Sequence, residues 1–241
     1  MTTTETSGLL KCCRITSALL LMLTGSAAAT PPRQWIVVSD IDDTIKETGV
    51  VKDVPARRGT DAHPKNGAHL LGDPWRAWRA VPGMAGRYAG WRARDGAEFV
   101  YLSRGPWFYR WRLTGFLRAH GFPAGRIVLN PCFPFAAPQY KDAALRRLVR
   151  AQPDGAFVFV GDSGESDPEI YGRLAREFPR AVRRVFIREV THCDPPVRYR
   201  RAFAGVPHGQ LFARAAQLPA ALDPSATLPA RHVPTSQAHR R

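Results

Sequence analysis

The sequence predicts an α/β protein with a Rossmann-like, doubly wound and mainly parallel sheet of five strands. Short apolar runs rich in β-branched residues alternate with helical patterns, as crossover connections require. Acidic residues follow two of these runs directly, and ligand sites lie at such carboxyl ends of parallel strands. The 241 residues, 44% of them hydrophobic, suffice for one domain of ordinary size and exclude a disordered polyelectrolyte.

The predicted strands and helices follow one another in a regular order. The apolar runs that predict buried strands are residues 35–39, 98–103, 126–129, 156–160 and 182–187. The periodic segments that predict helices are residues 82–94, 106–120, 142–150 and a helix from Asp167, where Pro168 suits the first turn. Residues 46–81 are rich in Gly, Pro, His and Arg without long periodicity, which predicts a flap or small cap over the strand ends.

The N-terminal segment has the pattern of a targeting signal. Lys11 and Arg14 precede an apolar run at residues 15–23, and small residues follow at 25–29. This pattern predicts a signal peptide at residues 1–29 that is cleaved, and therefore an exported protein, periplasmic or secreted. An uncleaved N-terminal anchor is the alternative, and no transmembrane span is expected in the mature chain.

The C-terminal segment, residues 195–241, is expected to be a basic tail rich in Pro and Ala, in which residues 209–222 are compatible with a short helix. Two cysteines remain after cleavage, Cys132 and Cys193, and they are able to pair in an oxidising compartment. Two thiols about sixty residues apart carry no disulfide framework signal, so the pairing stays open.

The net charge of the chain is strongly positive. Lys and Arg number 35 against 20 Asp and Glu, a formal charge of +15. Removal of residues 1–29 takes away one acid and two bases and leaves 33 − 19 = +14. This charge favours anionic partners: nucleic acid, an anionic lipid surface or phosphorylated substrates. No signal in the sequence indicates an oligomeric state.

Two acidic clusters are the candidate site. Residues 40–44 (Asp-Ile-Asp-Asp-Thr) follow the first predicted strand, and residues 161–167 follow the fourth. The first cluster alone is equally typical of a turn and of a functional site, and the second is also typical of a turn that starts a helix. Neighbouring parallel strands, however, would bring both to one edge of the sheet, where their carboxylates need a cation, and oxygen ligands favour Mg²⁺. Ser103 and Lys141, predicted at the same edge, suit the oxygens of a phosphate.

This order of residues resembles the haloacid dehalogenase superfamily of phosphohydrolases. It resembles more narrowly the catalytic domain of the actin-patch-associated phosphatidate phosphatase family, over residues 35–192. The segments that carry the resemblance are Ser39–Lys46, Val81–Met84, Phe99–Ser103, Gly161–Tyr171, Phe178-Pro179 and Val185–Arg188. One departure is Gly105 in Ser103-Arg104-Gly105-Pro106, where the family often has a second serine.

The resemblance implies roles for the acidic residues. Asp40 would be the nucleophile that forms an aspartyl-phosphate. Asp42 would protonate the leaving alkoxide and then activate water, while its backbone carbonyl binds the metal. Mg²⁺ would be held by Asp40, Asp162 and Asp167, the last directly or through water.

The resemblance also implies roles for the polar residues around these acids. Ser103 and Lys141 would hold phosphate oxygens in the transition state. Thr44 is expected to orient the loop of Asp40 rather than react. Lys46 and Arg104 are candidate substrate contacts.

The substrate implied by the family is phosphatidate at a membrane surface, hydrolysed to diacylglycerol. Two alternatives stay open: an exported phosphatase for soluble phosphomonoesters, and a basic polyanion-binding protein without catalysis. The acidic clusters argue against nucleic acid, because they would repel it. Several aromatic residues are either interfacial or core, and we expect most to be core: Trp75, Trp78, Trp107, Phe108, Tyr109 and Trp111.

Overall fold

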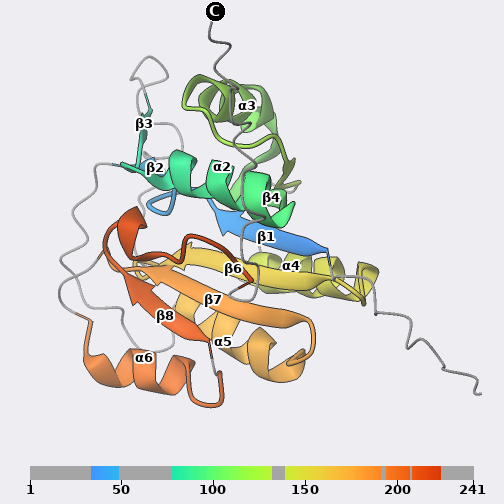
Figure 1. The fold of residues 1–241 in the computed structure, drawn as a ribbon, viewed down its shortest axis with the longest axis vertical. Helices are drawn as coiled ribbons and strands as arrows, with labels where there is room; N and C mark the ends of the chain where they lie inside the picture. Colours follow the sequence, from blue (N-terminus) through green and yellow to red (C-terminus); the bar gives the residue numbers. More distant parts are fainter. Residues whose placement is uncertain (1–33, 49–77, 132–138, 191–193, 207, 224–241) are drawn as a thin grey trace, which may run out of the picture. The chain divides into compact units, whose positions relative to one another are not determined.

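A computed structural model describes residues 34–48, 78–131, 139–190, 194–206 and 208–223 (Figure 1). The predicted signal peptide, most of the predicted flap, Trp75, Cys132 and Cys193 lie outside these residues. The strands are β1 (Trp35–Asp40), β2 (Lys46–Glu47), β3 (Arg79–Ala80), β4 (Glu98–Pro106), β5 (Arg126–Asn130), β6 (Ala156–Asp162), β7 (Val182–Arg188) and β8 (Gly209–Phe212). The helices are α2 (Met84–Asp95), α3 (Arg110–Ala119), α4 (Tyr140–Ala151), α5 (Asp167–Glu177) and α6 (Pro196–Ala202), with short 3-10 turns η1 (Trp107–Tyr109) and η2 (Ala215–Gln217).

The main sheet has six strands in the order β5-β4-β1-β6-β7-β8, and every neighbouring pair is parallel. The chain winds outward from β1 through β4 to β5, crosses back to β6, and continues to β7 and β8. The strand order therefore reverses between β1 and β6, and the carboxyl ends of these two strands flank the crevice where ligands bind in such sheets. The predicted doubly wound α/β fold is confirmed, with one strand more than the five expected.

Successive residues of β1 point to opposite faces of the sheet, and each face has its own core. Val37 packs in one apolar cluster with residues of α2 and α3. Ile36 and Val38 pack in the other cluster, with residues of α4, α5 and α6. Helices thus cover both faces (Figure 1), which explains why the central strands are apolar throughout.

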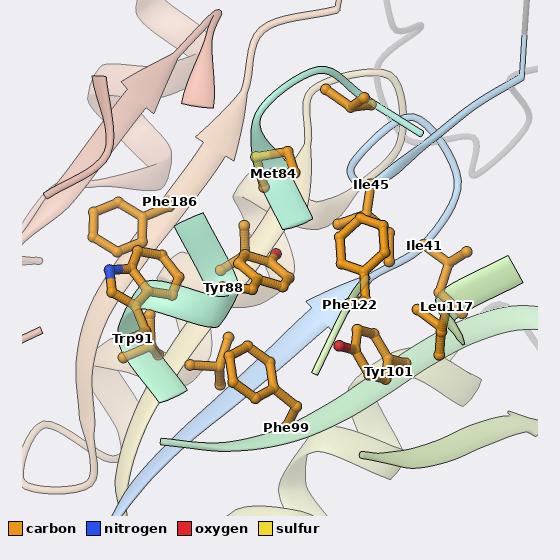
Figure 2. Packing of buried hydrophobic residues seen from close by; sticks show 14 of the residues in the cluster. Ile41, Ile45, Met84, Tyr88, Trp91, Phe99, Tyr101, Leu117, Phe122 and Phe186 are labelled. Carbon is orange, nitrogen blue, oxygen red and sulfur yellow. The ribbon is translucent and has the colours of Figure 1, made fainter. Parts of the chain in front are cut away.

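The core beside α2 is rich in aromatic rings (Figure 2). The ring of Trp91 stacks on those of Tyr88 and Phe186, with centroids 5.4 and 5.9 Å apart. Ser39 Oγ and the Tyr88 hydroxyl, 2.8 Å apart, form a hydrogen bond that joins β1 to this cluster. The cluster therefore fixes α2 against the strand that ends in Asp40.

The two ends of the segment after β1 are joined by a small antiparallel ladder between β2 and β3. Lys46 pairs with Ala80, and Glu47 with Arg79. The predicted flap thus begins and ends at one place, close to the turn after β1. The residues between 49 and 77 lie outside the description.

The helix predicted at residues 209–222 is wrong. Residues 209–212 form β8, which pairs in parallel with β7 as the outer strand of the sheet. Only residues 215–217 are helical, as a single 3-10 turn. Hydrogen bonding to β7 outweighs the weak helical pattern of an Ala-rich segment.

The expectation that most of the aromatic residues belong to the core is also wrong. Trp107, Phe108 and Trp111 are exposed to 59%, 38% and 77%. Helix α3 buries its inner stripe, Leu113, Phe116 and Leu117, so its period turns Trp111 to the opposite side. No helix among the described ranges is long and apolar enough to cross a membrane.

Candidate active site

The turn after β1 is anchored by two isoleucines in the core. Ile41 and Ile45 are fully buried, and the amides of Ile45 and Lys46 both donate to the carbonyl of Ile41. Asp43 adopts φ 59°, and its carboxylate accepts hydrogen bonds from the amide and hydroxyl of Thr48. Asp43 thus shapes the turn. Because Ile41 lies between Asp40 and Asp42 and is anchored in the core, these two acids stay at the end of β1.

The two predicted acidic turns meet. Asp40, Asp162 and Asp167 are buried, and each offers a carboxylate oxygen within 4.8 Å of the others. Asp40 ends β1, Asp162 ends the neighbouring β6, and Asp167 begins α5. Asp162 Oδ1 accepts from the amide of Gly164 at 2.7 Å, and Asp167 Oδ2 accepts from the amide of Asp162 at 3.3 Å. The convergence that the sequence predicted is therefore present.

Lys141 lies at the centre of this cluster. It stands in the first turn of α4, is 1% exposed, and donates to Asp40 Oδ1 at 2.7 Å and Asp167 Oδ1 at 2.5 Å. Thr44 donates to the other oxygen of Asp40 at 3.2 Å. Both oxygens of the Asp40 carboxylate are thus held in place, one by Lys141 and the other by Thr44.

Burial dominates the electrostatics of the site. It raises the pKa of the Asp40 carboxyl well above its usual range, although the ammonium of Lys141 opposes the rise. Burial likewise raises the pKa of Asp167 to about 6, against the same opposing charge. Burial lowers the pKa of Lys141, but the carboxylates of Asp167 and Asp40 outweigh this effect and raise it well above its usual value. Lys141 is therefore a permanent cation in the site.

The donor set fits a divalent metal ion. Three carboxylates and one ammonium leave a net charge of about −2 when all are ionised, which one divalent ion neutralises. All three metal-facing donors are oxygens, which hard ions such as Mg²⁺ prefer. Asp40, Asp162 and Asp167 are the residues able to hold such an ion.

Asp42 and Ser103 form the side of the site next to β4. Ser103, near the end of β4, donates to Asp42 Oδ2 at 3.4 Å and accepts from the amide of Gly105 at 3.0 Å. The ammonium of Lys46 lies 2.5 Å from Asp42 Oδ1. The side chain of Asp42 is not part of the group of three buried carboxylates around Lys141.

Arg198 is a site residue that the sequence did not reveal. From α6 it donates to the carbonyls of Ser163 and Glu165, at 2.6 and 2.5 Å, in the loop between Asp162 and Asp167. It also pairs with the carboxylates of Glu169 and Asp194. No local pattern marks such a residue, because it acts on a loop more than thirty residues away. The Pro195-Pro196 start of a helix was the available signal for α6.

Arg188 is a second residue of this kind. It ends β7 and donates to the carbonyl of Asp43 at 2.6 Å, so it supports the turn after β1 from the far side of β6. Both acidic turns are thus tied to neighbouring elements by an arginine.

The fold and the site together define a class: doubly wound α/β proteins with a carboxylate and lysine site at the carboxyl edge of the sheet. The resemblance to the haloacid dehalogenase superfamily indicated the same class. Within it, residues 35–189 match the family model of the phosphatidate phosphatase APP1 catalytic domain. The match covers more than half of the chain, and the chain belongs to this family.

Two curated relatives are similar to this chain over nearly two thirds of its length. The phosphatidate phosphatase APP1 of Saccharomyces cerevisiae is 29% identical over 161 residues, which are 63% of this chain and 25% of that protein. An uncharacterised protein of Schizosaccharomyces pombe is 28% identical over 166 residues, 64% of this chain and 25% of that protein. The chain thus matches only a quarter of the length of either relative.

Proposed function

We propose that this protein is a Mg²⁺-dependent phosphomonoester hydrolase that converts phosphatidate to diacylglycerol through an aspartyl-phosphate. One observation carries the proposal: the buried carboxylate of Asp40 is fixed by Lys141 and Thr44 and lies within 4.8 Å of Asp162 and Asp167. The family match and the yeast relative, which is named a phosphatidate phosphatase, support the choice of substrate.

The first step would transfer the phosphoryl group to the protein. An oxygen of Asp40 attacks phosphorus, the ester P–O bond breaks, and the leaving alkoxide takes a proton from Asp42 to become diacylglycerol. Lys141 and Ser103 would hold phosphate oxygens as negative charge develops, and their contacts with Asp167 and Asp42 support this role. Mg²⁺ bound by the three carboxylates would offset the repulsion between Asp40 and the incoming phosphate.

The second step would regenerate the enzyme. Water attacks the phosphorus of the aspartyl-phosphate and gives a proton to Asp42, and the bond between phosphorus and Asp40 breaks to release phosphate. Asp42 therefore serves as acid and then as base. Its place beside Ser103, on the side of the site next to β4, supports this double role.

Asp40→Asn tests the proposal. The amide keeps the shape of the side chain but is a poor nucleophile, so phosphate release should fall by at least about a thousandfold while the fold is kept. The assay measures phosphate from phosphatidate in detergent micelles and from p-nitrophenyl phosphate, with Mg²⁺ and with EDTA.

Asp142→Asn is the matched control. Asp142 follows Lys141 in sequence, but its carboxylate forms ion pairs with Arg146 and Arg173 and is not part of the carboxylate cluster. Its replacement by Asn should therefore leave turnover unchanged. A folded Asp40→Asn protein that retains more than about a tenth of the activity contradicts the nucleophile assignment. Turnover of the soluble ester without turnover of phosphatidate contradicts the lipid substrate.

We also propose that the protein is exported, on the basis of the signal-peptide pattern in residues 1–29. Cleavage after Ala29 makes Thr30 the first residue of the mature protein. N-terminal sequencing of the protein recovered from its native cells checks this, and an intact N-terminus contradicts it.

A further inference from the structure

Three large aromatic side chains are exposed beside the site, although aromatic residues usually lie buried. Trp107, Phe108 and Trp111 are exposed to 59%, 38% and 77%. We call these three residues the aromatic patch. They stand on η1 and at the start of α3, directly after the end of β4 that carries Ser103. Trp107 is four residues after Ser103, so the chain leads directly from the candidate active site into the patch.

A row of ring contacts joins this patch to the site. Trp107 meets Phe108 edge-on at 5.8 Å, and Phe108 packs on Tyr109 at 5.1 Å. Tyr109 in turn meets Trp78 at 6.2 Å.

Trp78 completes the connection. The ammonium of Lys46, which pairs with Asp42, lies 4.2 Å from the centroid of the Trp78 ring, and the guanidinium of Arg112 lies 4.4 Å from it. The patch is therefore supported by a row of rings that begins at the site.

The stretch of sequence that contains the patch carries charge of one sign. Between Glu98 and Asp142 the sequence has no acidic residue but five arginines: Arg104, Arg110, Arg112, Arg118 and Arg126. Arg118 lies on the exposed side of α3, seven residues after Trp111 and so near its face of the helix. Exposed tryptophans flanked by arginines are typical of surfaces that enter the headgroup region of an anionic bilayer.

We infer that the aromatic patch and the arginines of α3 dock the protein on an anionic membrane. The inference rests on the proposed function, because docking at this edge would present the phosphate of a membrane-embedded phosphatidate to Asp40. The indole rings would enter the interface and Arg118 would contact anionic headgroups. A protein partner is the competing occupant. The surface of such a partner would have to be acidic. An anionic bilayer interface matches both features of the patch, because it accepts indole rings and attracts arginines.

The test measures binding of the full chain to vesicles of phosphatidylcholine, with and without phosphatidylglycerol, which is anionic but not a phosphomonoester. The wild type should bind the anionic vesicles and bind less as salt increases. The double variant Trp107→Ser, Trp111→Ser should lose about tenfold or more in affinity. Arg118→Glu removes one positive and adds one negative charge, and should lose about tenfold.

Val197→Ser is the matched control, because Val197 is an exposed apolar residue on α6, which packs on the other face of the sheet. It should bind as the wild type does. All variants should hydrolyse p-nitrophenyl phosphate at the wild-type rate, whereas the double tryptophan variant should hydrolyse phosphatidate in vesicles about tenfold more slowly.

Three results would overturn the inference. The wild type does not bind anionic vesicles, or the double tryptophan variant binds them as tightly as the wild type does, or that variant loses only the ability to associate with a second copy of the chain. Vesicle binding does not depend on turnover. Tryptophan-dependent binding by a protein that hydrolyses neither substrate would therefore refute the proposed function and still support the docking surface.

Discussion

Gly161 determines how closely α5 approaches the end of β6. A methyl group at this position would lie 2.3 Å from Oδ2 of Asp167 and 2.7 Å from Cε2 of Tyr171. Both neighbours are fully buried, so neither can move aside freely. Asp167 reaches the carboxylate cluster only because residue 161 has no side chain.

Gly161→Ala should therefore weaken both the fold and the metal site. We expect the free energy of unfolding to fall by about 1–3 kcal/mol, as overpacking of a core does. Displacement of Asp167 should also reduce Mg²⁺ affinity, which titration calorimetry measures. Gly86→Ala on α2 is the control, because nothing lies within 4 Å of its added methyl, and it should be neutral or add about 0.4–1 kcal/mol. Equal stability and Mg²⁺ affinity in the Gly161 variant and the wild type would refute this account.

The residues that the sequence could predict for the site are those that end a strand or begin a helix. Asp40, Asp162 and Asp167 follow apolar runs directly, and one rule about parallel sheets then places them together. Arg198 and Arg188 could not be found in this way. Each contacts a backbone carbonyl of a turn that is remote in sequence, and carbonyls leave no mark in the sequence.

At the scale of elements, α6 acts as a clamp on the loop between Asp162 and Asp167. The guanidinium of Arg198 donates to two carbonyls of that loop and to the carboxylates of Glu169 and Asp194. Burial lowers the pKa of Arg198, but the hydrogen bonds and charges of the Glu169 and Asp194 carboxylates outweigh it and raise the pKa, so Arg198 stays charged. Helix α6 lies beyond the residues that match the family model, which end at 189.

Arg198→Gln should loosen this loop and weaken Mg²⁺ binding by about 10–100-fold, the usual cost of losing a residue that supports metal ligands. Saturating Mg²⁺ should restore most of the turnover, which a merely unfolded protein would not show. Arg198→Lys keeps the charge but loses the forked set of guanidinium donors. Its Mg²⁺ affinity should lie between those of the wild type and Arg198→Gln.

Arg200→Ala on the same helix is the control, because Arg200 is exposed. Its Mg²⁺ dependence of phosphate release should match that of the wild type. An unchanged Mg²⁺ dependence in Arg198→Gln would show that α6 does not position the loop.

Elements were predictable where their residues decide the structure locally. Strands such as Ala156–Asp162 are apolar and bounded by turn signals, and they were found within a few residues. Strand β8 has the sequence Gly-Gln-Leu-Phe, which contains no β-branched residue, and becomes a strand only because β7 offers its edge. The exposed aromatic patch was mistaken for core because hydrophobicity alone does not tell which side of a helix faces solvent.

For the whole molecule, the parallel sheet concentrates negative charge at one edge of a strongly basic chain. Asp40 and Asp167 both have a raised pKa, chiefly because of burial. In the metal-free protein, the contribution of Asp167 to stability is present below its ordinary pKa of 3.8 and is lost as the pH rises through about 6. A bound divalent ion offsets the cost of ionising the buried Asp167 carboxyl, because the ion binds the ionised form.

Mg²⁺ should therefore stabilise the protein more at about pH 8 than at about pH 5, where protons compete for Asp167. Mg²⁺ at about 100 times its Kd adds about 2.7 kcal/mol, which should raise Tm by roughly 5–10 °C in a domain of this size. Differential scanning calorimetry with Mg²⁺ and with EDTA at equal ionic strength measures the shift at each pH. Asp162→Asn should reduce the Mg²⁺-induced Tm shift at both pH values. A shift that is equal at the two pH values, or that survives in the variant, would place the ion elsewhere than among these three carboxylates.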